Sequence, residues 1–166
     1  MNLVGEWVHD MQLFHLVYTS ESTVGITDEL LREIQRKAVF RNQHRGVTGA
    51  LLCSDQRFLQ LLEGAADDVA EIFATISMDP RHTDVCCVYF GVTSERMFPE
   101  ASMGVAAPCS GSSQVTIEQL FKNLALPDHK SKDRYLQIAE TFRAFKDHVE
   151  PDLPGRCIAA DSTRIE

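Results

Sequence analysis

The chain has 166 residues, of which 44% are hydrophobic and 24% charged, and a formal net charge of −8, which suits one hydrophobic core with a short helical addition. The acidic balance argues against a nucleic-acid surface, because such a surface needs clustered Lys and Arg to neutralise phosphates. No stretch approaches the roughly 20 apolar residues of a membrane span, and the start lacks a signal-peptide pattern, so we expect a cytoplasmic protein.

The first half of the sequence predicts a strand, a helix and a hairpin. Residues 13–20 form a short apolar run rich in strand-favouring residues. Thr27 suits an N-cap, because its hydroxyl can accept from free N–H groups of the first turn, and the following apolar spacing predicts a helix that ends around residues 42–46. Residues 47–53 and 58–63 are two further apolar runs, and the polar residues between them fit a hairpin turn.

A second helix and a further strand complete the predicted core. Apolar residues recur at helical spacing over residues 69–76, and Pro80 cannot continue that helix. Residues 85–92 are predicted to form a buried strand, and a fifth short strand is expected near residues 101–106. The order of strands and helices predicts an α+β fold of the ferredoxin-like type, with both helices on one face of the sheet.

The composition changes after Ala107, where Pro, Ser and Gly are typical of a flexible linker. We therefore expect a core domain over residues 11–106, and a linker with a C-terminal helical extension over residues 107–166. Helices are predicted at 116–124 and at about 130–148. The second carries an apolar stripe that favours a homo-oligomer, although it could equally fold back over the open face of the sheet. The stripe comprises Tyr135, Ile138, Phe142, Phe145 and Val149.

Motifs for conventional enzymes are missing. Gly46 and Gly49 give only a GxxG, without the Lys and Ser/Thr of a phosphate-binding loop. No GxSxG motif is present. The adjacent Asp67 and Asp68 lie in a helical first turn, where their negative charges interact favourably with the helix dipole. The cysteines lack CxxC spacing and the histidines lack paired spacing, so we expect reduced thiols, no metal and no enzymatic activity.

Three polar residues occupy unusual positions. Tyr18 lies near the end of the first strand, Asn42 closes the first helix, and Gln60 interrupts an apolar strand. Each alone has an ordinary explanation: a tyrosine with its hydroxyl at the core rim, an asparagine at a helix end, or a glutamine on a wet sheet face. Gln60 is the most unusual, because a buried amide in a central strand needs partners or costs about 1–3 kcal/mol.

Five segments together resemble the BLUF family of blue-light sensors. They are LFHLVYTS, NQHRGVTGALL, FLQLLEG, IFATISMDPRH and RMFPEASMGV, in the order and at the spacing of that domain. The resemblance covers about residues 11–105. FLQLLEG alone is only moderately diagnostic, since apolar strands ending in Glu-Gly are common, whereas the five segments together are specific.

The resemblance implies roles for residues of this sequence in a flavin site. Tyr18 matches the photoactive tyrosine of the family, Gln60 its switching glutamine, and Met103 the methionine beside that glutamine. Asn42 matches the asparagine that bonds the pyrimidine edge of the flavin. Ile34 and Ile76 match the aliphatic pair that holds the ring. The polar group after the second helix is matched by Asp79, Arg81 and His82.

The resemblance further implies a photoreceptor that holds FAD, the usual ligand of the family, without covalent bonds. Light would drive an electron and then a proton from Tyr18 to the flavin, and Gln60 would relay the change because its amide has unlike ends. Rotation of the Gln60 amide and a change of its tautomer are both compatible with this relay role. The remaining residues are too few for a catalytic domain, so we expect output through self-association or a downstream protein partner.

One residue departs from the family pattern. Many members carry a tryptophan two residues before the methionine, where this chain has Ala101, which leaves space near Gln60 and puts the direction and lifetime of the signal in doubt. Two other functions fit parts of the sequence. An acylphosphatase-type hydrolase would need a Gly-rich anion loop after the first strand, which is absent. A light-independent ferredoxin-like interaction module would keep the fold without the pigment, and colour would distinguish it.

Overall fold

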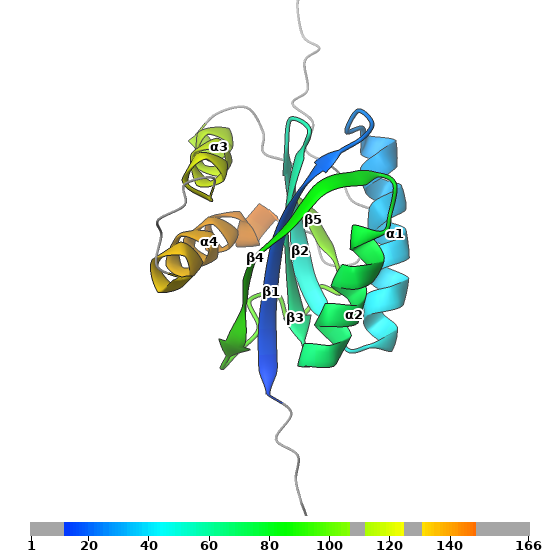
Figure 1. Ribbon diagram of the computed structural model, residues 1–166, viewed down its shortest axis with the longest axis vertical. Helices are drawn as coiled ribbons and strands as arrows, with labels where there is room; N and C mark the ends of the chain where they lie inside the picture. The colour runs from blue at the N-terminus through cyan, green and yellow to red at the C-terminus, as the bar shows by residue number, and fades with distance from the viewer. Residues whose placement is uncertain (1–11, 107–111, 125–130, 149–166) are drawn as a thin grey trace, which may run out of the picture.

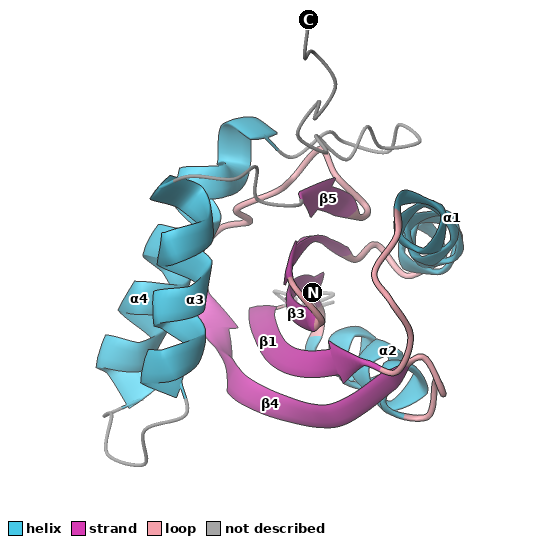
Figure 2. Cartoon of the chain, turned by 90° about the horizontal axis from the view of Figure 1, so that it is seen from above, coloured by secondary structure: helices cyan, strands magenta, loops and turns pink. Residues whose placement is uncertain are grey.

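The fold is a single mixed sheet with a pair of helices on each face (Figures 1 and 2). The computed structural model describes residues 12–106, 112–124 and 131–148. The elements are β1 (Leu13–Ser22), α1 (Asp28–His44), β2 (Thr48–Ser54), β3 (Arg57–Gly64), α2 (Ala66–Ser77), β4 (His82–Thr93), β5 (Gly104–Ala106), α3 (Ser112–Leu124), α4 (Ser131–Phe145) and the 3-10 helix η1 (Lys146–His148).

The sheet confirms the ferredoxin-like prediction and adds the expected fifth strand. Its order is β4-β1-β3-β2-β5, so β1 and β3 are the central strands. β1 pairs antiparallel with β3 and β4, β2 pairs antiparallel with β3, and β5 lies parallel to β2. In the register of β1 and β3, Tyr18 lies directly opposite Gln60. Two residues that are 42 positions apart in sequence therefore meet at the centre of the sheet.

Local sequence signals set the ends of these elements. Thr27 caps α1 as predicted, and its hydroxyl accepts from the Leu30 N–H at 3.2 Å. After α1 the chain turns at Gly46, whose φ of 60° lies in the region that glycine adopts without steric cost. The turn between β2 and β3 places Asp55 at a φ of 54°, a conformation that Asp tolerates better than most residues.

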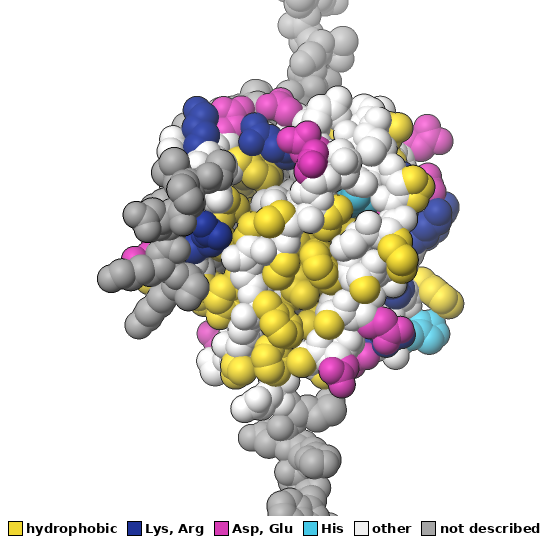
Figure 3. Space-filling model, in the orientation of Figure 1, with side chains coloured by type: hydrophobic (Ala, Val, Ile, Leu, Met, Phe, Trp, Pro, Cys, Tyr) yellow, Lys and Arg dark blue, Asp and Glu magenta, His cyan; other side chains and the backbone are white. Residues whose placement is uncertain are grey.

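The prediction that residues 85–92 form a buried strand is wrong. The apolar run forms part of β4, but this strand lies at the edge of the sheet and pairs only with β1. None of its residues is fully buried, and Phe90 and Val92 are 49% and 56% exposed. Cys86 and Cys87 are also exposed. Figure 3 shows hydrophobic side chains reaching the surface on the side of the molecule where β4 runs.

Two separate hydrophobic clusters lie on the two faces of the sheet. Alternate residues of a strand point to opposite faces, so Leu16 and Tyr18 belong to the cluster under α1 and α2, whereas Val17 belongs to the cluster under α3 and α4. β3 divides in the same way, with Leu62 in the first cluster and Leu61 in the second. Each face of the central strands therefore has its own packed layer.

The apolar stripe of α4 folds back over the sheet, which was one of its two predicted fates. Ile138, Phe142 and Phe145 are buried in the cluster that includes side chains of β1, β2 and β3. Tyr135 is half-buried on the same helix, and Val149 lies outside the described residues. The buried part of the stripe therefore needs no second subunit to cover it.

Gly49, at the start of β2, allows a close approach that no other residue permits. A Cβ at this position would overlap the backbone carbonyl oxygen of Leu61. The Gly49 N–H also donates to the Ala101 carbonyl at 2.9 Å, which holds the segment before β5 against β2. Both contacts are between backbones, so rotation of a side chain cannot relieve an added methyl group.

We expect Gly49→Ala to lower the free energy of unfolding by about 2 kcal/mol or more, because overpacking against fixed backbone shifts the strands apart. The matched control is Gly25→Ala, which has no atom within 4 Å of its Cβ position and should change stability by less than about 0.5 kcal/mol. Urea unfolding followed by circular dichroism measures both. Equal losses in the two variants would contradict the close approach at Gly49.

Candidate functional site

A buried hydrogen-bonded chain joins the two central strands to the segment before β5. The Tyr18 hydroxyl donates to Gln60 Oε1, and Gln60 Nε2 donates to Met103 Sδ at 3.2 Å. Tyr18 and Met103 are completely buried, and Gln60 is 3% exposed. The amide of Gln60 therefore has a partner at each of its unlike ends, which explains how an apolar strand accommodates it.

Two amides of α1 bind the backbone beside Met103. Asn42 Nδ2 donates to the Ser102 carbonyl at 2.7 Å, and Gln35 Nε2 donates to the Met103 carbonyl at 3.0 Å. Both side chains are buried. Asn42 was predicted from the sequence, whereas Gln35 was not. The signal was its position seven residues before Asn42, which places both amides on the buried face of one helix.

Ile34 of α1 and Ile76 of α2 lie in the same cluster as Tyr18, and both are buried. The ring of Phe73, also on α2, lies 5.4 Å from the Tyr18 ring between centroids. Tyr18 is therefore covered from the side of the two helices by aliphatic and aromatic groups. The two isoleucines thus share one cluster with the tyrosine, and their role in holding a ring stays a prediction.

The residues after α2 form a charged group at the edge of this cluster. Arg81 Nη2 pairs with Asp79 Oδ2 at 2.5 Å, and Arg81 Nη1 reaches Glu33 Oε1 of α1 at 3.3 Å. The hydrogen bond from Arg81 lowers the pKa of Asp79 to about 2. His82 Nδ1 lies 2.9 Å from the Ser20 hydroxyl, and burial lowers the pKa of His82, so its ring is neutral at pH 7.

The environment of Tyr18 controls its proton. Burial raises the pKa of the Tyr18 hydroxyl far above its ordinary value; Arg41 opposes this increase and Asp79 adds to it. The two charges therefore act on the tyrosine in opposite directions. A phenol in this setting keeps its proton at any physiological pH unless the ring is first made more acidic, and loss of an electron from the ring does that.

Of the sequence-predicted residues, Gln60, Ile34 and Ile76 lie with Tyr18 in one buried group, and the chemistry of the whole set is compatible with a flavin. A flat ring needs apolar contact on its faces and a few polar groups at its edge. Ile34 and Ile76 have the apolar side chains that the faces require, and Asn42 and Gln60 have the polar amides that the edge requires. Asn42 Nδ2 donates to the Ser102 carbonyl, and Asn42 Oδ1 accepts from Arg41 Nε at 3.4 Å and has a second lone pair that can accept from a ring N–H.

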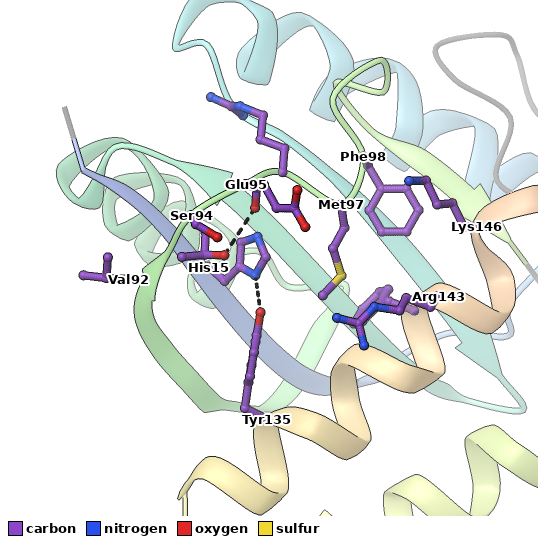
Figure 4. A pocket seen from close by; sticks show the side chains of 12 residues that line it. His15, Val92, Ser94, Glu95, Met97, Phe98, Tyr135, Arg143 and Lys146 are labelled. Carbon is purple, nitrogen blue, oxygen red and sulfur yellow. Dashed lines mark hydrogen bonds between the residues drawn. The ribbon is translucent and has the colours of Figure 1, made fainter. Parts of the chain in front are cut away.

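A second polar chain lies on the opposite face of the sheet, and the sequence analysis missed it. His15 Nε2 lies 2.8 Å from Glu63 Oε2. His15 Nδ1 lies 3.0 Å from the Tyr135 hydroxyl of α4, as Figure 4 shows. Glu63 accepts from the N–H groups of Met97 at 2.5 Å and Phe98 at 2.9 Å. The sequence held one signal of this chain, a charged Glu63 at the end of an apolar strand. His15 lies directly opposite Glu63 in the register of β1 and β3.

This carboxylate is ionised by its partners. Burial raises the pKa of Glu63, but hydrogen bonds from His15 and from the N–H groups of Met97 and Phe98 outweigh burial and hold the pKa below its ordinary value. The pair is fully buried, at 1% exposure for His15 and none for Glu63. Glu63 thus links β1, α4 and the segment that leads to Met103.

Ala101 lies on the opposite side of the sheet from Gln60. It is buried in the cluster that contains Phe98 and Phe142, whereas Met103 belongs to the cluster with Tyr18. The expectation that this small residue leaves space beside Gln60 is therefore wrong. A larger side chain at position 101 would press on α4 instead, because Phe142 is part of that helix.

We expect Glu63→Ala to lower the free energy of unfolding by about 3–5 kcal/mol, because it leaves His15 and two backbone N–H groups buried without their acceptor. Glu71→Ala is the matched control: it breaks an ion pair with Arg45 in which Glu71 is 61% exposed, and should cost less than about 1 kcal/mol. Urea titration at pH 7 measures both. A loss at Glu63 no larger than at Glu71 would show that the buried carboxylate does not hold these elements together.

A ferredoxin-like sheet with a buried tyrosine–glutamine pair beneath two helices defines a small sensor domain of the flavin-binding class. The family described as "BLUF: Sensors of blue-light using FAD" matches residues 13–104, and the chain belongs to this family. It is thus a blue-light sensor domain of a flavin-binding family. No helix in the described parts of the chain is long and apolar enough to cross a membrane.

The relatives include enzymes of which this chain matches only a part. The photoactivated adenylate cyclase subunit beta of Euglena gracilis is 39% identical over 155 residues, which is 93% of this chain and 16% of the relative. The chain thus spans about a sixth of that length. Among solved structures, the dark state of the BLUF protein BlrB has a TM-score of 0.62 at 26% identity, covering 80% of this chain and 96% of BlrB. A bacterial light-regulated adenylyl cyclase has a TM-score of 0.60 at 25% identity, covering 81% of this chain and 36% of the cyclase.

Proposed function

We propose that residues 11–106 hold FAD noncovalently and that Tyr18 and Gln60 are the photoactive pair. The observation that carries the proposal is the bonding of Gln60, which accepts from Tyr18 at one end of its amide and donates to Met103 at the other. The description of the family names FAD as the flavin. Residues 107–166 form a linker and a helical extension that transmits the signal, and the chain acts as a cytoplasmic sensor with no catalytic activity of its own.

Each binding residue has a distinct part in this proposal. Ile34 and Ile76 hold the faces of the ring, and Asn42 Oδ1 accepts from its pyrimidine N–H. The charged and polar groups that follow α2 hold the outer edge: Asp79, Arg81 and His82. Arg81 also pairs with Glu33, so the same guanidinium joins the segment after α2 to α1 beside the proposed ring.

The chemistry follows from the proton and electron behaviour of Tyr18. When bound, the flavin supplies absorption of blue light and an excited state that takes up an electron. In the dark, burial keeps the Tyr18 hydroxyl protonated and donating to Gln60. Loss of an electron to the excited flavin would make the phenol strongly acidic, so its proton would pass along this hydrogen bond to Gln60 Oε1, and one proton would follow the electron to the flavin. Rotation or tautomer change of the Gln60 amide then exchanges donor and acceptor toward both neighbours.

The signal leaves the site through the segment before β5. A change at Gln60 acts on Met103, and the carbonyls of Ser102 and Met103 are the acceptors of Asn42 and Gln35. The other part of this segment is held by Glu63, which joins His15 and α4. A bias of 1–3 kcal/mol in such a contact changes a population ratio about 5- to 150-fold. The output is a change in self-association or in binding of a downstream protein.

The absorption spectrum tests this function directly. Purified protein should be yellow, and blue light should shift its flavin spectrum reversibly to longer wavelength without bleaching. Tyr18→Phe and Gln60→Leu should keep the flavin and abolish the shift, because each removes one end of their hydrogen bond. Tyr89→Phe and Gln56→Leu are matched controls on β4 and in the β2–β3 turn, and should respond as wild type does.

Two outcomes would reject the proposal. A preserved shift in Gln60→Leu would remove the relay role from Gln60. A protein that binds no flavin, even after reconstitution, would favour the light-independent interaction module. Flavin released by heating and separated by chromatography distinguishes FAD from FMN.

Flavin affinity tests the proposed role of Asn42. We expect Asn42→Ala to weaken flavin binding about tenfold, because the variant loses one hydrogen bond to the ring and leaves the Ser102 carbonyl without its donor. The adjacent Gln43→Ala, which changes an exposed side chain of the same helix, is the control. Fluorescence titration of free flavin into each apoprotein gives the dissociation constants of Asn42→Ala and Gln43→Ala. Equal dissociation constants for the two variants would exclude Asn42 from the site.

A further inference from the structure

A cavity of about 610 Å³ lies on the face of the sheet opposite Tyr18 and Gln60 (Figure 4). Its walls come from β1, from the end of β4 and the segment after it, and from α4 with η1. The volume falls within the range of about 300–1,000 Å³ that is usual for small-molecule sites. The proposed flavin function makes no use of this cavity.

The charge of the lining contrasts with the charge of the chain. Three cations, Arg96, Arg143 and Lys146, line the cavity against one carboxylate, Glu95, although the whole chain carries a formal net charge of −8. None of the three cations forms an ion pair with another residue in the described ranges. Even with the ionised Glu63 behind the wall counted beside Glu95, the cations are in excess, and an excess of positive charge at a partly enclosed surface attracts anions.

Arg96 is held in place by neutral groups. Its guanidinium donates to the Thr48 hydroxyl at 2.7 Å and to the carbonyls of Glu63 at 2.7 Å and Gly46 at 2.8 Å. These bonds fix its position, and the Thr48 hydroxyl that it binds donates in turn to the ionised Glu63 carboxylate at 3.1 Å, so Glu63 offsets part of its charge. Arg143 and Lys146, by contrast, are exposed on α4 and η1, where they can move to meet a ligand.

The rest of the lining combines polar and apolar side chains, and its inner wall is firmly packed. Phe98 and Phe142 are at most 4% exposed, and their rings meet edge to face at a centroid distance of 6.1 Å. Met97 adds a flexible apolar side chain, and Figure 4 shows it on the β4–β5 segment across from α4. Tyr135 is fixed by His15 and by stacking on Tyr89 at 4.3 Å. The walls are therefore formed before any ligand arrives.

We propose that this cavity binds a small organic anion, a carboxylate or phosphate attached to an apolar body. The cations neutralise the anionic group, and the partly exposed side chains of Val92, Met97 and Tyr135 contact the apolar body. Such a ligand touches α4 and the segment after β4 at once. It thereby stabilises the contact between them.

Calorimetric titration of the flavin-loaded protein in the dark tests the proposal. The probes are decanoate and decyl phosphate, which carry both features, decanol, which lacks the charge, and inorganic phosphate, which lacks the apolar body. We expect one site for decanoate or decyl phosphate, with decanol and inorganic phosphate binding at least about tenfold more weakly. The tighter of the first two probes identifies the anionic group. Equal binding of decanol, or of inorganic phosphate, would overturn the proposal.

Variants locate the binding in the cavity. Arg143→Gln should weaken decanoate binding about tenfold, and Ser94→Trp, which places an indole at the exposed rim, should reduce it further. Arg32→Gln removes an exposed arginine from α1 across the sheet and should leave binding unchanged. An unaltered flavin spectrum confirms that each variant is folded. Wild-type affinity in Arg143→Gln, or no heat of binding with the wild type, would reject the site.

Discussion

The structure depends on one buried amide. Gln60 sits in a central strand, where an unsatisfied amide would cost about 1–3 kcal/mol, and the neighbouring elements are arranged to satisfy it. Tyr18 of the adjacent strand lies opposite Gln60 in the register of β1 and β3 and donates to it. Met103, in the segment that precedes β5, accepts from Gln60. That segment is held in turn by amides of α1. Gln60 thus connects the central strands to the segment that α1 also binds.

The sheet separates two chemistries that share the same strands. In β3, Gln60 faces the helices α1 and α2, whereas Glu63 faces α4, and the same alternation divides Tyr18 from His15 in β1. The two polar chains therefore lie on opposite faces. Their connection runs through the backbone of the segment between β4 and β5, which Glu63 binds at one place and Gln35 at another.

The parts of this structure that the sequence predicted are those set by short-range patterns or by a familiar combination of segments. Thr27 marked a helix start, and Tyr18 and Gln60 were recognisable because a polar residue in an apolar strand is unusual. What the sequence did not reveal depends on which elements become neighbours. The apolar run of β4 has the composition of a buried strand, yet its place at the sheet edge leaves Phe90 and Val92 exposed. The partners of Gln35 and Glu63 include backbone groups, and a pattern of side chains in the sequence does not predict contacts with backbone groups.

The division of the sheet into two faces has an evolutionary consequence. Substitutions on the α4 side, such as the alanine at position 101, can accumulate without disturbing the side chains that surround Tyr18. One sensor core can then be combined with many different domains or partner proteins that respond to its signal. The matching segment in the Euglena cyclase subunit accounts for about a sixth of a much larger protein, as such reuse would produce.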